Sequence, residues 1–323
     1  MIWMSIACGL IAISSCLLTG ATLRFLKRRA ILDHPNERSS HTTPIPRGGG
    51  IAIVVITLIL WAVPVQGTLE HGILFVLCGA ILIAAISWFD DIRPLSPLIR
   101  ICVQALAIAV AVNALSSEGL VFQGIFPAWL DTGLSCLLWL WFINLFNFMD
   151  GIDAISGIET VCICGGLLVL AAFQDATVPA SWLSMTLAAA TLGFLWWNCP
   201  PAKIFLGDIG SITIGFLLGW LLLKSAIAGY WASALILPLY YLGDATITLV
   251  KRGLRGEKVW RAHREHFYQR AVQSGKSHGT VSSAILAANF ALIGLAYLAV
   301  TSPIIALIIA TMVVAVLMIW MRG

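Results

Sequence analysis

The chain has 323 residues, of which 60% are hydrophobic and only 11% are charged, and its mean hydropathy is +0.96. Soluble globular domains carry about a quarter of their residues as Asp, Glu, Lys and Arg, so this composition excludes an ordinary soluble domain and predicts a polytopic membrane protein. The formal net charge of +4 is small, and nothing in the sequence indicates nucleic acid as a partner.

Apolar segments long enough to cross about 30 Å of hydrocarbon as helices recur along the whole chain. We predict eleven spans, at residues 2–23, 48–66, 71–89, 99–116, 132–147, 158–173, 179–198, 209–226, 229–250, 282–300 and 303–320. We find no tandem repeat, low-complexity tract or linker. The sequence therefore predicts an all-α fold, a single transmembrane domain over residues 1–323.

The distribution of Lys and Arg predicts the orientation of these helices. The cluster of Arg24, Lys27, Arg28 and Arg29 follows the first span, which indicates a retained anchor whose N-terminus is periplasmic. All later Lys and Arg then fall on the cytoplasmic side except Lys224, which can reach the interface from a helix end.

The polar stretches all lie on the predicted cytoplasmic side. They are SSHTTPIPRGGG (39–50), FDDIRPLSPLIR (89–100), NLFNFMDGIDAISG (144–157), NCPPAKIFLGDIGS (198–211) and RAHREHFYQRAV (261–272). A transporter needs polar groups near the membrane midplane, whereas an enzyme with a cytoplasmic donor and a lipid acceptor needs one interfacial cleft. The one-sided pattern favours the enzyme. The first stretch is the weakest signal, because a Pro/Gly-rich turn into the second span explains it equally well.

Polar residues recur every three positions at the end of the fifth span, at Asn144, Asn147, Asp150 and Asp153. If the helix continues, they share one side and suit Mg²⁺ or the phosphate and ribose groups held through it. The alternative is a helix end with a cap, which needs only one such residue.

Two further acidic signals accompany it. Asp90 and Asp91 end the third span, where adjacent carboxylates repel unless a cation or a catalytic task uses them; an N-cap for the next helix is the alternative. Phe205-Leu-Gly-Asp208-Ile-Gly-Ser opens the eighth span, where glycines and free amides suit a diphosphate with Mg²⁺ held by Asp208, or where Asp208 is simply the cap.

The 251–281 loop is basic and contains His263, Arg264 and His266. Most of its Lys and Arg residues are explained by the positive-inside rule, as cations that anchor a cytoplasmic loop at the membrane surface. The two histidines, spaced i, i+3, could share a helix face and donate to phosphate oxygens or move a proton.

In this order, the motifs FDD, NLFNFMDGIDAISG, NCPPAKIFLGDIGS and the late histidine loop resemble the polyprenyl-phosphate N-acetylhexosamine-1-phosphate transferases, glycosyltransferase family 4. The resemblance implies an inner-membrane, multi-pass enzyme that transfers a sugar-1-phosphate from a UDP-sugar to undecaprenyl phosphate and releases UMP. It also implies Mg²⁺ as the cofactor, with Mn²⁺ as a substitute. The bilayer and these two substrates are the expected partners, and a homodimer is left open.

The resemblance also assigns roles to residues of this chain. It implies Asp90 as the base that deprotonates the lipid phosphate, by single displacement or through a covalent phospho-aspartate, with Asp91 beside it. Catalytic roles extend to Asp150, His263 and His266, and metal binding to Asp208 and Asp150. The implied substrate-binding residues are Asn147, Asp153, Asn198, Lys203, Phe205 and Arg264.

The histidine motif His263-Arg-Glu-His266 followed by FYQRAV departs from the peptidoglycan and enterobacterial-antigen branches. It looks more like the initiating transferases of O-antigen synthesis, which use 6-deoxy-N-acetylhexosamines, so this donor is the first expectation. The alternative donor is UDP-GlcNAc. A cation-coupled transporter and a lipid-diphosphate phosphatase are the alternatives from other classes.

Overall fold

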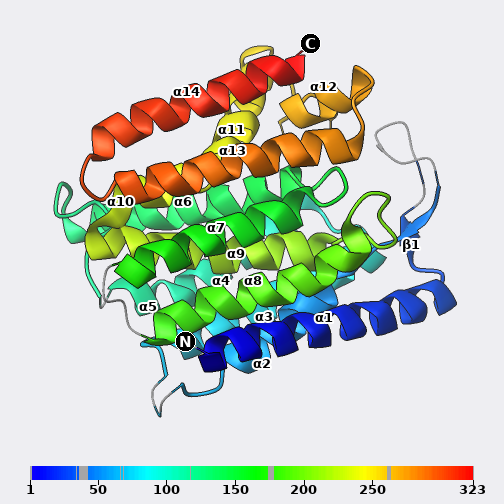
Figure 1. Cartoon of the computed structure of the whole chain (residues 1–323), viewed down its shortest axis with the longest axis horizontal. Helices are drawn as coiled ribbons and strands as arrows, with labels where there is room; N and C mark the ends of the chain where they lie inside the picture. The colour runs from blue at the N-terminus through cyan, green and yellow to red at the C-terminus, as the bar shows by residue number, and fades with distance from the viewer. Residues whose placement is uncertain are drawn as a thin grey trace.

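The computed structural model describes residues 2–33, 35, 43–65, 67, 69–116, 118–173, 178–259 and 263–322. Residues 39–42 of the first polar stretch and 261–262 of the last lie outside these ranges. The described chain is a bundle of long helices that run roughly side by side, with a small β-hairpin and the short helix α12 at one end (Figure 1).

The first half of the chain contains α1 (Ile2–Arg28), β1 (Leu32–Asp33), β2 (Ile45–Pro46), α2 (Gly50–Trp61), α3 (Ile73–Ile92), α4 (Pro97–Ala111), α5 (Asn113–Ser116) and α6 (Ala128–Phe148). The second half contains α7 (Ile155–Phe173), α8 (Val178–Asn198), α9 (Asp208–Ser225), the π-helical segment η1 (Ala226–Tyr230), α10 (Trp231–Ile236), α11 (Leu239–Leu254), α12 (Phe267–Gln273), α13 (His278–Leu298) and α14 (Pro303–Arg322). β1 and β2 pair antiparallel, with Leu32 opposite Pro46.

The helix α9 is the centre of the bundle. Every residue from Asp208 to Leu223 is buried, and α9 packs against α2, α3, α6 and α7. A helix that is apolar on all sides is stable only when other helices surround it or lipid covers it. Neighbouring helices therefore surround α9, and the polar residues gather at its N-terminus.

Eight helices in the described ranges are long and apolar enough to cross a membrane, which fits a polytopic membrane protein. Each of the eleven expected spans overlaps a helix, but α2 has only 12 residues, and α8 and α11 are not among the eight. The count of eleven and the orientation thus stay predictions. The expected break before Pro303 is confirmed, because α13 ends at Leu298 and α14 begins at Pro303.

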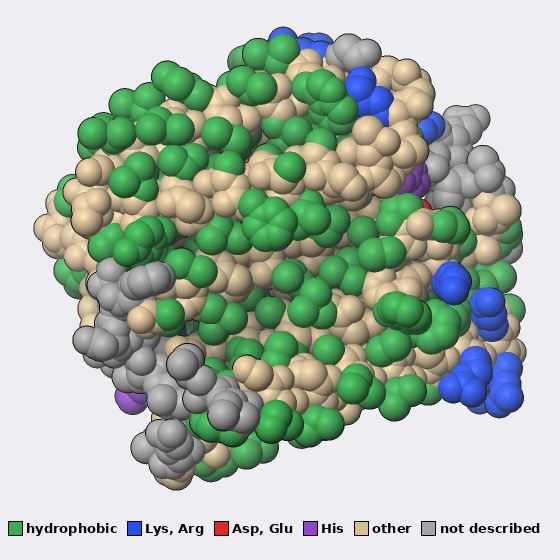
Figure 2. Space-filling model, viewed as in Figure 1, with side chains coloured by type: hydrophobic (Ala, Val, Ile, Leu, Met, Phe, Trp, Pro, Cys, Tyr) green, Lys and Arg blue, Asp and Glu red, His purple; other side chains and the backbone are tan. Residues whose placement is uncertain are grey.

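The predicted boundary between the eighth and ninth spans is less sharp than expected. Helical structure continues from Asp208 to Ile236, and the direction changes within it at Gly229, whose φ is 95°. On the face drawn in Figure 2, hydrophobic side chains cover most of the surface, while Lys and Arg gather at the right-hand end. This is the end at which β1 lies in Figure 1.

Candidate active site

Three segments that are distant in sequence meet at the N-terminus of α9. The segment after β2 pairs with the turn before α9: Arg47 and Phe205 form a parallel bridge, and the Gly49 amide donates to the Phe205 carbonyl at 2.8 Å. The Gly50 amide donates to the Leu206 carbonyl, also at 2.8 Å. The Pro/Gly-rich stretch is therefore a backbone partner of the 205–208 turn, which the sequence did not indicate.

Glycines permit this close pairing. A Cβ atom on Gly50 would lie 2.2 Å from the Cα of Gly210, a distance at which backbone atoms overlap. Gly207, directly before α9, has a φ of 77°, in the left-handed region that favours glycine. The first turns of α2 and α9 can touch only because Gly50 and Gly210 lack side chains.

Asp91, in the last turn of α3, caps α9 from outside that helix. Its Oδ1 accepts from the Asp208 amide at 2.9 Å and its Oδ2 from the Ile209 amide at 3.0 Å. These are two of the amides that a helix start leaves unpaired, and an anion there is stabilised by the helix dipole. The capping role considered for Asp208 thus belongs to Asp91, and the Asp208 side chain is directed elsewhere.

Arg47 joins the two carboxylates. Its Nε lies 2.8 Å from Asp91 Oδ1, and its Nη2 donates to Asp208 Oδ1. Burial alone would lower the pKa of Arg47, but the carboxylates of Asp208 and Asp91 raise it above its ordinary value, so the guanidinium is a permanent cation here.

Asp90 forms a second arginine pair next to the first. Its Oδ1 accepts from the Leu95 amide at 2.6 Å, and its Oδ2 lies 3.0 Å from Nη1 of Arg100. The same Nη1 is 3.5 Å from Asp208 Oδ2. Asp90, Asp91 and Asp208 therefore form one cluster with two guanidinium groups, here called the carboxylate–arginine cluster.

The predicted row of Asn144, Asn147, Asp150 and Asp153 on one helix side is wrong. The helix α6 ends at Phe148 and α7 begins at Ile155, so Asp150 and Asp153 lie in the break between them. Asn144 donates to Gln104 Oε1 at 2.7 Å, away from the cluster. Asn147 remains close to it, because Ser211 in α9 donates to its Oδ1 at 2.6 Å.

Asp150 is a buried carboxylate in the break after α6. Burial raises its pKa to about 6 despite a hydrogen bond from Ser156 and the more distant charge of Arg47. Among the described residues Asp150 makes no ion pair, and no three His, Cys, Asp or Glu side chains are arranged to hold a metal ion. Carboxylate oxygens suit a hard cation whose other ligands come from a substrate or water, so Mg²⁺ at Asp150 and Asp208 stays a prediction.

Asp153 and Asn198 brace the loops around this break. Asp153 accepts from the Ala202 amide at 3.1 Å and lies 3.2 Å from Nδ1 of His278. Asn198 accepts from the Ala154 amide and donates to the Ile204 carbonyl, both at 2.9 Å. Both side chains therefore form hydrogen bonds with the backbone of the loops around the break.

Two other positions near the break have clear structural features. Ala154 has a φ of 66°, in the left-handed region that favours glycine. Lys203 lies on the surface, with its Nζ 5.5 Å from the centre of the Trp197 ring.

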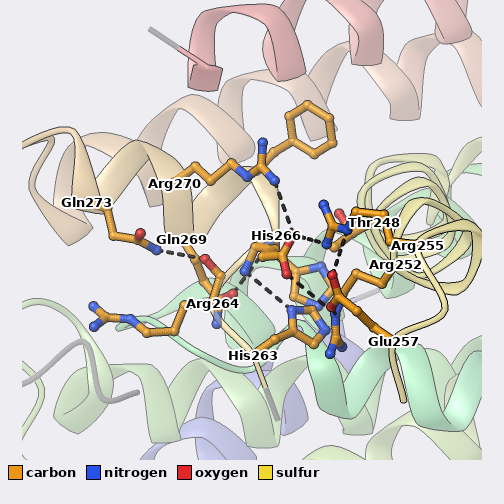
Figure 3. A network of polar contacts seen from close by, with 12 residues as sticks. Thr248, Arg252, Arg255, Glu257, His263, Arg264, His266, Gln269, Arg270 and Gln273 are labelled. Atoms are coloured by element: carbon orange, nitrogen blue, oxygen red, sulfur yellow. Dashed lines mark hydrogen bonds and ion pairs between the residues drawn. The ribbon is translucent and has the colours of Figure 1, made fainter. Parts of the chain in front are cut away.

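The histidine loop is organised by Asp244 of α11, which is fully buried. Its carboxylate lies 3.0 Å from Nδ1 of His266 and accepts from the amides of Phe267 at 3.0 Å and Tyr268 at 3.3 Å. Asp244 therefore orients the His266 ring and caps α12. Thr248 of the same helix, labelled in Figure 3, donates to Asp244 Oδ1 at 3.3 Å.

The expectation that His263 and His266 share a helix face is wrong, because α12 begins only at Phe267. The rings are nevertheless adjacent, with centres 4.7 Å apart (Figure 3). Burial and the neighbouring His266 lower the pKa of His263 to about 4, so this ring is neutral at pH 7. The guanidinium of Arg264 extends away from both rings in Figure 3.

Tyr268 connects the histidine loop to the break after α6. Its hydroxyl donates to the Phe148 carbonyl at 3.1 Å and lies against Gly151, where a Cβ atom would be 2.2 Å from the hydroxyl oxygen. The expected convergence of the 144–157 and 261–272 stretches thus occurs through a tyrosine, and Gly151 is needed for close packing.

Four polar residues of this region escaped the sequence analysis: Arg47, Arg100, Asp244 and Tyr268. The arginines lay inside quoted motifs, where a single cation in a Pro/Gly-rich turn was the available signal. Asp244 stood within an apolar segment, where an acidic residue is costly and indicates a specific partner.

Comparison with known proteins supports the motif-based resemblance. The model of glycosyl transferase family 4 matches residues 73–226, which include α3, α6 and α9. A decaprenyl-phosphate N-acetylglucosaminephosphotransferase of Mycolicibacterium smegmatis is 31% identical over 282 residues, covering 76% of this chain and 69% of the relative.

Two further relatives carry similar names. A probable undecaprenyl-phosphate N-acetylglucosaminyl 1-phosphate transferase of Bacillus subtilis is 28% identical over 272 residues, covering 78% of this chain and 74% of the relative. An undecaprenyl-phosphate alpha-N-acetylglucosaminyl 1-phosphate transferase of Thermotoga maritima is 30% identical over 205 residues, covering 63% and 60%. With its acidic motifs gathered at the start of α9, the chain belongs to glycosyl transferase family 4, the polyprenyl-phosphate sugar-1-phosphate transferases.

Proposed function

We propose that this protein transfers N-acetylglucosamine-1-phosphate from UDP-N-acetylglucosamine to undecaprenyl phosphate and releases UMP. The observation that carries the proposal is the carboxylate–arginine cluster at the N-terminus of α9, which combines groups for anionic phosphates with a candidate base. The choice of donor follows the relatives, whose names specify N-acetylglucosamine.

Different residues of the cluster have different proposed roles in the reaction. Arg47 and Arg100 attract the phosphate groups of donor and acceptor, because guanidinium forks pair with phosphate oxygens. Asp90 takes the proton of the acceptor phosphate, whose oxygen then attacks the sugar-linked phosphorus. We assign Asp91 a positioning role, because its two oxygens cap the first amides of α9 and its Oδ1 pairs with Arg47. A route through a phosphorylated Asp90 is the mechanistic alternative.

Asp208 and Asp150 would hold Mg²⁺, which would neutralise the diphosphate and stabilise the departing UMP. The histidine loop closes the other side of the site. Asp244 engages Nδ1 of His266 and leaves the other ring nitrogen for the substrate.

An apolar cavity supports a long isoprenoid acceptor. It has a volume of about 460 Å³ and lies between α6, α9 and α10 at the C-terminal end of α9, so it would receive a distal part of the isoprenoid chain and not its phosphate. Its wall includes Leu138, Trp141, Leu222 and Leu235. Such a surface suits hydrocarbon and offers almost nothing to a polar ligand.

The first expectation from the histidine motif, a 6-deoxy-N-acetylhexosamine donor for O-antigen synthesis, is supported less well than the GlcNAc alternative. The relatives named above are N-acetylglucosamine enzymes. The 6-deoxy donor stays a prediction that a donor panel tests directly.

The experiment uses purified protein, undecaprenyl phosphate and a panel of UDP-N-acetylhexosamines that includes 6-deoxy sugars. UMP release is followed with Mg²⁺, with Mn²⁺ and with a chelator. We expect release that needs lipid and divalent cation and is fastest with UDP-N-acetylglucosamine. Asp208→Asn should lose at least about a hundredfold in rate, as for other groups that stabilise developing charge.

Glu70→Gln is the matched control, because Glu70 pairs with Lys224 far from α9's first turn. It should keep normal activity. Release of inorganic phosphate without UMP, or UMP release that does not need the lipid, would contradict the proposal. Faster turnover of a 6-deoxy donor would reinstate the O-antigen reading.

A further inference from the structure

Basic residues around the histidine loop fall into two groups. Arg252, Arg255 and Arg270 belong to an ion-pair network with Glu257 and Glu265; for example, Arg255 Nη2 lies 2.6 Å from Glu265 Oε2 (Figure 3). Two carboxylates therefore compensate most of the charge of these three arginines.

Lys251, Lys276 and Arg322 differ from them. None of the three forms an ion pair with any residue in the described ranges. Each is instead held over an aromatic ring, and we call them the ring-held cations. Lys251 Nζ lies 5.6 Å and Arg322 Cζ 5.2 Å from the centre of the same Phe267 ring, and Lys276 Nζ lies 5.1 Å from that of Trp320.

This arrangement keeps like charges together without an acidic partner. Ring faces attract cations, but an exposed pair of this kind contributes only about 0.5–1 kcal/mol. Lys251 and Arg322 share one ring, and both are exposed. Because these two positive charges have no acidic partner in the described ranges, an anion can bind between them.

The position of these residues indicates the kind of anion. Arg322 and Trp320 are in the last turn of α14, and Lys276 lies just before α13; α13 and α14 are both candidate spans. Trp320 is 40% exposed. A partly exposed tryptophan beside Lys and Arg at a helix end is typical of the headgroup region of a bilayer, so charge and location both match a lipid phosphate.

The site is connected to the histidine loop. Phe267, whose ring is shared by Lys251 and Arg322, is buried and directly follows His266. Its amide donates to Asp244, the residue that also holds His266. A ligand that bridges Lys251 and Arg322 would therefore hold α11 and α14 against Phe267.

We propose that the ring-held cations bind the phosphate headgroup of an anionic membrane phospholipid, which stabilises the histidine loop. Each cation near an anionic surface changes binding about fivefold, so removing all three should weaken it roughly a hundredfold. The proposal concerns a structural lipid and goes beyond the transfer reaction.

The test measures thermal unfolding of the full chain in nanodiscs of phosphatidylcholine with increasing phosphatidylglycerol. The wild-type midpoint should rise and saturate at a low fraction of the anionic lipid. In Lys251→Gln/Lys276→Gln/Arg322→Gln the rise should vanish, and in Lys276→Gln alone the half-saturating fraction should increase about fivefold.

The matched control is Lys27→Gln/Arg28→Gln/Arg29→Gln at the end of α1, which removes the same charge from another exposed basic cluster that includes Arg29 over Phe25. It should respond to phosphatidylglycerol as the wild type does. An equal loss in both triple variants would mean a general surface-charge effect and would overturn the proposal.

Two further outcomes would also overturn it. One is an unchanged wild-type midpoint at every lipid fraction. The other is an equal rise with inorganic phosphate in pure phosphatidylcholine, which would indicate a site for soluble anions. The readout needs neither donor nor acceptor, so it stands apart from the transfer assay.

Discussion

Removing the guanidinium of Arg47 should disconnect the two carboxylates at the start of α9. The substitution Arg47→Met keeps the length of the side chain but leaves Asp91, whose side chain is fully buried, and Asp208 without their common cation. Breaking a buried ion pair costs about 3–5 kcal/mol. Because the Arg47 side chain is 35% exposed, solvent screening reduces our expectation to about 2–3 kcal/mol.

The effect can be measured by thermal unfolding in detergent. For a chain of 323 residues, a loss of that size corresponds to a fall in melting temperature of roughly 3–5 °C. Arg47→Lys should recover part of the loss, since an ammonium keeps the charge but cannot reach both carboxylates with a planar fork.

A double-mutant cycle with Asp91→Asn isolates the contact. If Arg47 and Asp91 stabilise each other as their 2.8 Å distance indicates, the double variant should lose less stability than the two single variants together. The difference in unfolding free energy should be about 2 kcal/mol. Arg29→Met, at the exposed end of α1, is the control and should leave the melting temperature unchanged. Strict additivity, or an Arg47→Met protein that melts within about 1 °C of the wild type, would refute the reasoning.

Three other substitutions test separate parts of the structure. Gly50→Ala should destabilise by about 1–3 kcal/mol, because its Cβ would overlap Gly210, whereas Gly9→Ala, with open space around it, should be neutral in the same thermal assay. The pKa of His263 lies below its ordinary 6.5, near 4, so its contribution to stability is complete above pH 6.5 and is lost as the pH falls toward 4; the melting temperature should drop over that window less in His263→Gln than in the wild type. Glu159, fully buried in α7, accepts from Asn289 Nδ2 at 2.7 Å while Asn289 Oδ1 has no hydrogen bond. Glu159→Gln can serve both groups and should keep the melting temperature, but Glu159→Leu leaves Asn289 unpaired and should cost about 1–3 kcal/mol. Equal losses in both Glu159 variants would speak against this pairing.

The fold class and the position of most helices could be predicted from the sequence because hydropathy is a local property. The break before Pro303 was predicted, and the eighth span was predicted to begin at residue 209, one residue after the observed start of α9 at Asp208. The prediction that α6 continues beyond Phe148 was wrong. Polar residues at every third position look the same in the sequence whether the helix continues through them or ends among them. For the same reason the i, i+3 spacing of His263 and His266 did not predict that they precede α12.

Composition, hydropathy and the order of the acidic motifs by themselves determined that this is a polytopic membrane protein and which family its motifs resemble. Only the tertiary structure decided the partners of each charge: Arg47 with Asp208, 161 positions apart, and Asp91 with the amides of α9, 117 positions away. The physical reason is that span prediction depends on the transfer of neighbouring residues into lipid, whereas an ion pair depends on which helix ends meet. Asp91 as a cap, Arg47 as a bridge and Asp244 as the anchor of His266 all follow from that packing.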